Sequence, residues 1–409
     1  MPPIGDYALV GAIAAVCSFA LTFPLRRLAA RLSFVAKPDE RRLHPKPIPY
    51  GGGLAMFLAF LIAMIVAGRI GHLSGIFQGS SEPLGVVIGA GVILVVGLVD
   101  DAHEISAPAK VAGEVLAAMC LVFLGVTMFW LKIPLAGTVV LSSDLTPLVT
   151  ALWVIGITNA VNLIDGLDGL AAGIVAIASG ALAVYGIRLI DLGVLQATNL
   201  GPLIAVITCG ICLGFLPHNF NPAKVFMGDA GALFLGLLMA AATMEIGGRT
   251  AQVSGQTYFF YAPLFLPLFI LGVPMTDMAF AYIRRIAKHT SISTPDTDHV
   301  HHRLVRLGHG PRRTVVILWS WTAVLSGFVL FPLFAPASTS ILPFGVIFLG
   351  LLLFTLFHPG LRKERALETE AASASVAAEA VRAEETRTAP PLGGVGTGKG
   401  GAEPGPAHH

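Results

Sequence analysis

Two adjacent carboxylates, Asp100 and Asp101, end a long apolar run of the sequence. Carboxylates this close repel each other, so the pair favours a bound cation or a cationic partner. The simpler alternative is a pair of solvated side chains that mark the end of a helix. The pair therefore predicts a cation site where other polar groups join it.

A second group of polar residues has the spacing of one helix face. Asn159, Asn162 and Asp165 follow one another at intervals of three, and Asp168 comes next. Side chains three residues apart are neighbours on a helix surface. A helix cap needs one residue of this type, whereas four occur here and two of them lie inside the apolar run. This excess favours a functional site over a polar cap followed by a turn.

Two more clusters lie further along the chain. Asp229 opens an apolar run shortly after Asn221, where an Asp can cap a helix N-terminus and the same N-terminus favours an anion such as phosphate. The last cluster is rich in imidazole but lacks the Cys or spaced His that complete a structural zinc site. Imidazole and guanidinium groups suit a diphosphate or a uracil-type ligand better, and this cluster comprises His299, His301, His302 and Arg303.

The elements that must position these clusters are membrane helices. Of the 409 residues, 55% are apolar and only 12% are charged, about half the ~25% typical of soluble proteins. A soluble fold with so little polar surface would expose large apolar patches. The formal net charge of +2 gives no sign of a nucleic-acid partner. We predict an all-α, multi-pass integral membrane protein.

A membrane-spanning helix needs ~20 mostly apolar residues to cross ~30 Å of hydrocarbon. Eleven runs fit this requirement approximately, and the third and fifth are the weakest because they are short and end in acidic or amide residues. The predicted spans are 7–26, 50–68, 84–99, 109–128, 147–163, 169–187, 201–217, 229–245, 259–283, 315–333 and 341–358.

Lys and Arg residues predict the orientation, because they are enriched in cytoplasmic loops. If the N-terminus is outside, most of them fall inside, and the outside loops hold Arg69, Lys132, Arg188 and Arg249. The C-terminus and every polar cluster are then cytoplasmic. A transporter or flippase for polyprenyl-linked sugars would hold its site near the bilayer midplane, and a structural scaffold would have no such clusters, so both are weaker alternatives.

Two regions of different composition follow from this pattern. Residues 1–361 are the predicted polytopic catalytic domain, with active-site loops on the cytoplasmic face. Residues 362–409 are rich in Ala, Glu, Thr, Gly and Pro, a composition that predicts a disordered cytoplasmic tail. The spacing of Gly85 and Gly89 indicates helix packing, and the sequence does not fix whether the protein forms a homodimer.

Taken in order, the clusters resemble the polyprenyl-phosphate N-acetylhexosamine-1-phosphate transferase family, of glycosyltransferase 4 type. The resemblance covers about residues 35 to 310 and rests on Val99-Asp100-Asp101, on residues 159–169 and 226–231, and on His299-x-His301-His302. It implies an enzyme of the bacterial inner membrane that moves a sugar 1-phosphate from a UDP-sugar to a lipid phosphate and releases UMP. It also implies Mg²⁺ as the cofactor, with Mn²⁺ as a substitute.

The histidine motif separates two branches of this family. His-x-His-His followed by Arg303 resembles the branch that starts teichoic acid, arabinogalactan or lipopolysaccharide-type polymers from UDP-GlcNAc. The peptidoglycan branch typically has three consecutive histidines and ten spans. We expect transfer of GlcNAc-1-phosphate to undecaprenyl or decaprenyl phosphate, with phospho-MurNAc-pentapeptide transfer as the alternative.

The resemblance also implies roles for individual residues. The expected catalytic residues are Asp100, Asp101, Asp229 and His301, with Asp229 and Asp101 at the metal. The expected substrate-binding residues are Lys46, Asn159, Asn162, Asp165, Asp168, Asn221, His299, His302 and Arg303, and Lys37 is as well placed as Lys46 for the lipid phosphate. That phosphate has a second pKa of about 6 and is already mostly a dianion at neutral pH. We therefore expect the paired aspartates to position groups rather than to act as a strong base.

Overall fold

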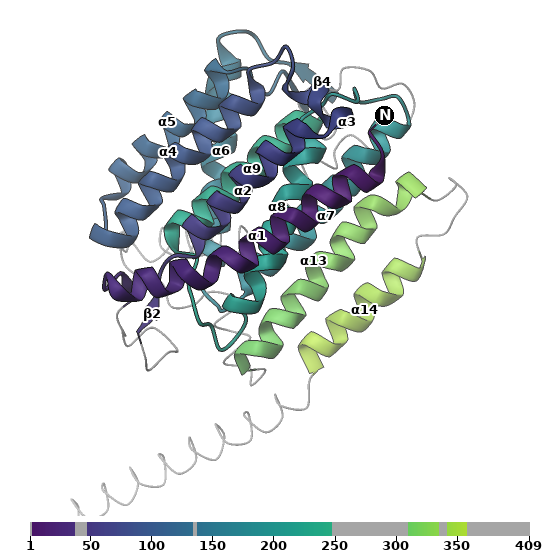
Figure 1. Cartoon of the computed structure of the whole chain (residues 1–409). Coiled ribbons are helices and arrows are strands. Elements are labelled where there is room, and N and C mark those ends of the chain that lie inside the picture. Colours follow the sequence, from purple (N-terminus) through teal and green to yellow (C-terminus); the bar gives the residue numbers. More distant parts are fainter. Residues whose placement is uncertain (1, 37–46, 134–136, 248–309, 335–341, 358–409) are drawn as a thin grey trace, which may run out of the picture. The chain divides into compact units, whose positions relative to one another are not determined.

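A computed structural model of the chain describes residues 2–36, 47–133, 137–247, 310–334 and 342–357. Within these ranges the regular elements are helices, two short strand pairs and one 3-10 turn, Gly75–Phe77. The long helices run alongside one another (Figure 1). The helices are α1 (Ile4–Arg31), α2 (Gly52–Arg69), α3 (Gly71–Ser74), α4 (Glu82–His103), α5 (Ala107–Phe123), α6 (Leu145–Ile164), α7 (Leu170–Asp191), α8 (Gly201–Asn219), α9 (Gly228–Gly247), α13 (Gly310–Phe334) and α14 (Leu342–Phe357).

The prediction of a multi-pass membrane protein is confirmed. Eight helices of the described ranges are long and apolar enough to cross a membrane, namely α1, α2, α4, α6, α7, α8, α9 and residues 310–331 of α13. Two of the predicted spans, 109–128 and 341–358, correspond to helices of only 17 and 16 residues, α5 and α14. The predicted span 259–283 and the predicted tail lie outside the described residues.

Helix ends differ from the predicted ends where polar residues continue a helix. The third predicted span stops at residue 99, but α4 continues to His103. Asp100 and Asp101 therefore belong to the last helical turn. A polar side chain can extend a helix at a membrane interface, where water is available to solvate it.

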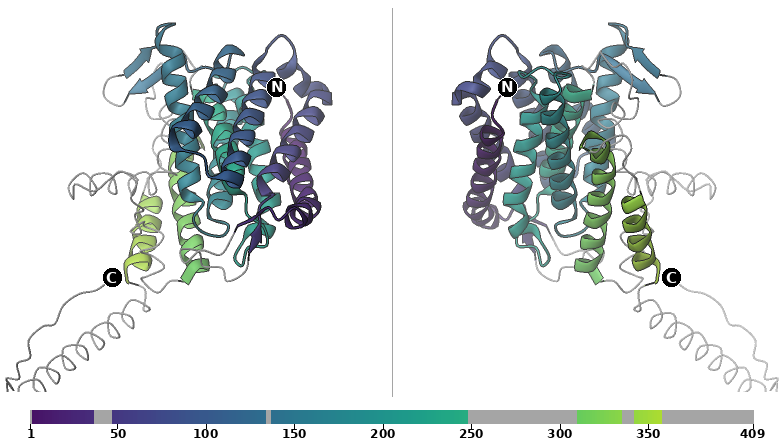
Figure 2. Two further views of the ribbon diagram at one scale, coloured as in Figure 1. Left: turned by 90° about the vertical axis from the view of Figure 1, so that its left-hand side faces the viewer. Right: turned by 90° about the vertical axis from the view of Figure 1, so that its right-hand side faces the viewer.

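Two antiparallel strand pairs were not predicted. Strand β1 (Val35–Ala36) pairs with β2 (Ile48–Pro49), with Val35 opposite Pro49, and β3 (Trp130–Ile133) pairs with β4 (Gly137–Val140), with Trp130 opposite Val140. Strands of two to four residues are too short to show an alternating pattern in sequence. The β3–β4 hairpin joins α5 to α6 and lies beyond the ends of the helices (Figure 2).

Helix α9 is the centre of the bundle. Almost all of its residues are buried, and it packs against α2, α4, α6, α7 and α8. Two glycines permit close backbone contact: a Cβ at Gly97 of α4 would lie 2.3 Å from the Cα of Ala230, and one at Gly236 would lie 2.5 Å from the Cα of Thr158 in α6. Small residues allow such close packing of membrane helices. The N-terminus of α9 is thereby held between α4 and α6.

The chain segment before α9 is also fixed by the start of α2. The N–H of Gly52 donates to the carbonyl of Phe226 (3.1 Å), and the N–H of Gly53 donates to that of Met227 (3.2 Å). Phe226 in turn donates to the carbonyl of Pro49 (3.0 Å). These bonds set the position at which α9 begins.

Candidate active site

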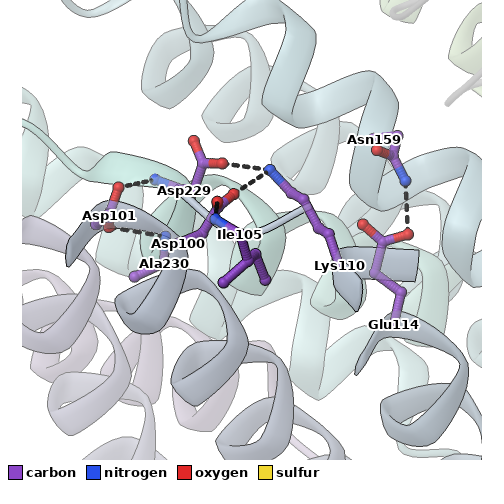
Figure 3. Close-up of polar contacts among 8 residues, drawn as sticks. All are labelled: Asp100, Asp101, Ile105, Lys110, Glu114, Asn159, Asp229 and Ala230. Carbon is purple, nitrogen blue, oxygen red and sulfur yellow. Dashed lines mark hydrogen bonds and ion pairs between the residues drawn. The ribbon is translucent and has the colours of Figure 1, made fainter. Parts of the chain in front are cut away.

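Four helix ends meet at one end of the bundle and bring together residues distant in sequence. Helices α4 and α6 end there, whereas α5 and α9 begin there (Figure 3). Each helix contributes one polar side chain, and the four side chains form one group: Asp100 from α4, Lys110 from α5, Asn162 from α6 and Asp229 from α9.

Lys110 connects the two carboxylates of this group. Its ammonium lies 2.8 Å from the Oδ2 atom of Asp100 and also forms an ion pair with Asp229. With its amide turned to suit both neighbours, Asn162 donates to Asp229 (3.2 Å) and accepts from Lys110 (3.0 Å). The side chains of Lys110 and Asp100 are 15% and 13% exposed, whereas that of Asp229 is 34% exposed. Asp229 is thus more open to a ligand than Asp100 or Lys110.

Asp101 points elsewhere, toward the first turn of α9. Its carboxylate accepts the N–H groups of Asp229 (2.8 Å) and Ala230 (3.2 Å). These are otherwise unpaired donors at a helix N-terminus. Gly228, with φ +68°, allows this approach, because a Cβ there would lie 2.3 Å from the Asp101 carboxylate. Asp101 therefore caps α9 and holds Asp229 in place. Its expected place at the metal stays a prediction.

A second pair lies one helical turn away. Asn159 donates to the Oε2 atom of Glu114 (2.7 Å), and Glu114 is completely buried. Sequence reasoning did not identify Glu114 or Lys110 as site residues. Two charged residues four apart within the predicted span 109–128 were the available signal, because charged residues inside membrane helices usually have a function.

The turn after α6 carries two more of the expected residues. Asp168 accepts from the Nδ2 group of Asn221 and from the N–H of Ala223, both at 2.9 Å. Arg312, at the start of α13, donates from Nε to the backbone carbonyl (3.0 Å) and side-chain Oδ1 (3.2 Å) of Asn221. Arg312 was not among the residues expected from the sequence. Its bonds tie the start of α13 to the turn that holds Asp168.

Asp165 lies close enough to Asp229, Asp101 and Asp168 to interact with them electrostatically. Burial, together with the carboxylates of Asp229, Asp101 and Asp168, raises the pKa of Asp165 to about 8. Six acidic side chains thus share this end of the bundle, namely Asp100, Asp101, Glu114, Asp165, Asp168 and Asp229. A bound cation would relieve the electrostatic repulsion among these acidic groups.

The residues present fit a hydrated Mg²⁺ ion. Among the described residues no group of three or more His, Cys, Asp or Glu side chains is arranged to hold a metal alone. Mg²⁺ usually takes one or two carboxylates and completes its shell with water and substrate phosphates. The ammonium of Lys110 between Asp100 and Asp229 shows that this position favours positive charge, so these two carboxylates are the best candidate ligands.

Several expected residues lie outside the described residues. They are Lys37 and Lys46 near the start of the chain, and His299, His301, His302 and Arg303 before α13. Their roles stay predictions.

Comparisons with known proteins agree with the sequence motifs. A family model described as glycosyl transferase family 4 matches residues 83–247. The chain is 38% identical to decaprenyl-phosphate N-acetylglucosaminephosphotransferase of Mycobacterium tuberculosis (strain H37Rv) over 352 residues, which cover 84% of this chain and 87% of the relative. It is also 38% identical to the protein of the same name from Mycobacterium leprae, over 86% of this chain and 89% of the relative. A probable undecaprenyl-phosphate N-acetylglucosaminyl 1-phosphate transferase of Bacillus subtilis is 36% identical over 72% of this chain and 76% of its own length.

Proposed function

Because this chain belongs to glycosyltransferase family 4, we propose that it transfers GlcNAc-1-phosphate from UDP-GlcNAc to a polyprenyl phosphate. The products are polyprenyl-diphosphate-GlcNAc and UMP. The observation that carries this function is the 38% identity, over 84% of the chain, to a transferase named for decaprenyl phosphate and N-acetylglucosamine. The His299-x-His301-His302 motif supports the same substrate over phospho-MurNAc-pentapeptide.

The reaction exchanges one phosphoryl linkage for another without a net proton transfer. An oxygen of the lipid phosphate dianion bonds to the phosphorus that carries the sugar, and the bond from that phosphorus to the bridging oxygen breaks. The bridging oxygen leaves as part of UMP. Since the nucleophile is already a dianion at neutral pH, no carboxylate needs to remove a proton from it.

The main barrier is repulsion between the dianion and the diphosphate, and catalysis of this kind is largely positioning and charge neutralisation. Mg²⁺, when bound, supplies positive charge to the diphosphate oxygens and orients them. Asp100 and Asp229 would hold the ion, and Asp101 keeps Asp229 in place through the first turn of α9. The ammonium of Lys110 adds a positive charge beside both carboxylates.

The remaining site residues surround this centre. We assign Asn159, Asp165, Asp168 and Asn221 to the sugar-nucleotide side, because they lie on the end of α6 and the turns that follow α6 and α8. We further propose that the site faces the cytoplasm, in keeping with the distribution of Lys and Arg between the loops.

UMP release by the detergent-purified protein tests the proposal. We expect release from UDP-GlcNAc only when polyprenyl phosphate and Mg²⁺ are both present, with loss on addition of EDTA. Asp229→Asn should reduce the rate by at least about 100-fold, because metal-assisted charge stabilisation is worth several kcal/mol. The matched control is Asp191→Asn, an exposed carboxylate at the far end of α7. A near-normal rate for Asp229→Asn would refute the metal assignment, and a folded wild type that releases no UMP would refute the function.

A further inference from the structure

Glu114 is a buried carboxylate that the mechanism above does not use. It lies in the middle of the apolar helix α5 and has no solvent exposure. Burying an ionisable group in this way costs several kcal/mol unless it is well paired. A charged residue inside a membrane helix therefore indicates a functional role.

The contact with Asn159 fixes the orientation of one amide. The Nδ2 group of Asn159 donates to Glu114 Oε2 (2.7 Å) and to the carbonyl of Ile155 (2.9 Å). An amide nitrogen has two hydrogens, so both are used. The Ile155 carbonyl can only accept a hydrogen bond, and so can an ionised Glu114 carboxylate. If the Asn159 amide were reversed, its oxygen would face these two acceptors without a hydrogen between them. Asn159 can offer a ligand only its Oδ1 atom.

This pair is one step of a ladder that reaches the proposed metal site. Lys110 and Glu114 are one turn apart on α5, and Asn162 and Asn159 are about one turn apart on α6. The first step, Lys110 with Asn162, touches Asp229. The second step, Glu114 with Asn159, lies beside Lys110 (Figure 3). Asn159 therefore lies about one helical turn from the proposed metal site.

We propose that Glu114 is a positioning residue that makes Asn159 an acceptor for a hydrogen-bond donor of the sugar nucleotide. The inference rests on the proposed function and specifies how that substrate is read. Phosphate oxygens are excluded as partners of Asn159, because they accept hydrogen bonds. The donor is an N–H or O–H group of the base or of the amino sugar.

A purely structural link between α5 and α6 accounts for less of the geometry. The Oε1 atom of Glu114 is buried and has no hydrogen-bond partner among the described residues. Buried polar atoms are rarely left in this state. In a link that served only packing, a neutral side chain would hold the two helices without this cost.

Exchanging donor and acceptor within the pair tests the proposal. Asn159→Asp alone places two carboxylates in contact, and Glu114→Ala leaves the partly buried Asn159 amide without one of its two acceptors. Each should lower kcat/KM for UDP-GlcNAc by about 10- to 100-fold. In the double variant Glu114→Gln/Asn159→Asp, the new Gln donates to the new Asp, the total charge is unchanged and an outward acceptor remains. The bond to the Ile155 carbonyl is lost in this variant as it is in Asn159→Asp alone, so the comparison of the two isolates the contact between residues 114 and 159. This double variant should recover to within about tenfold of wild type.

The losses should fall on the sugar nucleotide. The KM for polyprenyl phosphate and the Mg²⁺ concentration for half-maximal rate should change by less than about threefold. Glu104→Gln, an exposed carboxylate just after α4, is the control and should keep the wild-type rate. A double variant as impaired as either single variant would overturn the proposal. The proposal would also be overturned if the kinetic constants for both substrates changed equally and in proportion to the loss of thermal stability.

Calorimetric binding of UDP-GlcNAc separates this inference from the transfer reaction. If the wild type binds UDP-GlcNAc but releases no UMP, the proposed function fails. The pair is then judged by binding alone: Glu114→Ala should weaken binding, and the exchanged double variant should restore it. A wild type that does not bind UDP-GlcNAc overturns both proposals.

Discussion

Replacing Lys110 by Met should destabilise the metal-free protein and make it respond more strongly to Mg²⁺. Met keeps the length and apolar stem of the side chain but removes the ammonium that lies between Asp100 and Asp229. Removing one partner of a buried ion pair costs about 3–5 kcal/mol, whereas exposed pairs contribute about 0–1 kcal/mol. Asp100 is largely buried and Asp229 is partly open. We therefore expect a loss of about 3 kcal/mol in the free energy of unfolding.

Mg²⁺ should reverse this loss, because it supplies the missing positive charge to the same two carboxylates. Without a competing ammonium, the variant should bind Mg²⁺ roughly tenfold more tightly than wild type does. The assay is thermal unfolding of EDTA-treated protein in detergent while Mg²⁺ is added back. Lys224→Met, which removes an exposed lysine from the loop between α8 and α9, is the control and should behave as wild type. A variant as stable as wild type without Mg²⁺, or one with the same response to Mg²⁺, would refute the reasoning.

Two further predictions concern the same end of the bundle. Gly228→Ala should cost more stability than Gly193→Ala: both backbones have φ near +70°, but a Cβ at Gly228 meets the Asp101 carboxylate at 2.3 Å, whereas at Gly193 nothing lies within 4 Å. Thermal unfolding should show a loss of about 1 kcal/mol in the free energy of unfolding for Gly193→Ala and a larger loss for Gly228→Ala, which should also lose UMP release. Equal losses of stability would contradict the close contact between Gly228 and Asp101. The pKa of Asp165 in the folded protein is raised to about 8, so the folded metal-free protein binds the Asp165 proton more tightly than the unfolded chain does. The free energy of unfolding should therefore fall as pH rises from about 4 to about 8. Asp165→Asn should flatten that part of the stability–pH curve measured in EDTA, and an unchanged slope would show that another group is responsible.

Much of the site could be predicted because helix periodicity is visible in sequence. The spacing of Asn159 and Asn162 predicted one shared face, and in the structure both face the α5 side chains that complete the site. Clustering of polar residues at span ends also predicted that Asp100 and Asp229 would lie at one end. These inferences need only local geometry and the cost of burying polar groups in a membrane.

The parts that could not be predicted depend on which helix faces which. Neighbouring residues on a helix point about 100° apart, so Asp100 and Asp101 cannot share a direction: the first meets Lys110, and the second caps α9. Lys110 near the start of a predicted span looks like any interfacial lysine until the end of α4 and the start of α9 are placed beside it. Arg312 likewise shows its contact with Asn221 only in three dimensions.

Identification of the lipid product tests the central claim most directly. Detergent-purified protein would be given polyprenyl phosphate and Mg²⁺ with either UDP-GlcNAc or UDP-MurNAc-pentapeptide, and the lipid extract analysed by mass spectrometry together with UMP release. We predict polyprenyl-diphosphate-GlcNAc and an equal amount of UMP from UDP-GlcNAc alone. A lipid product from the pentapeptide substrate alone would contradict the substrate assignment, and absence of any lipid-linked product from folded protein would contradict the transferase function itself.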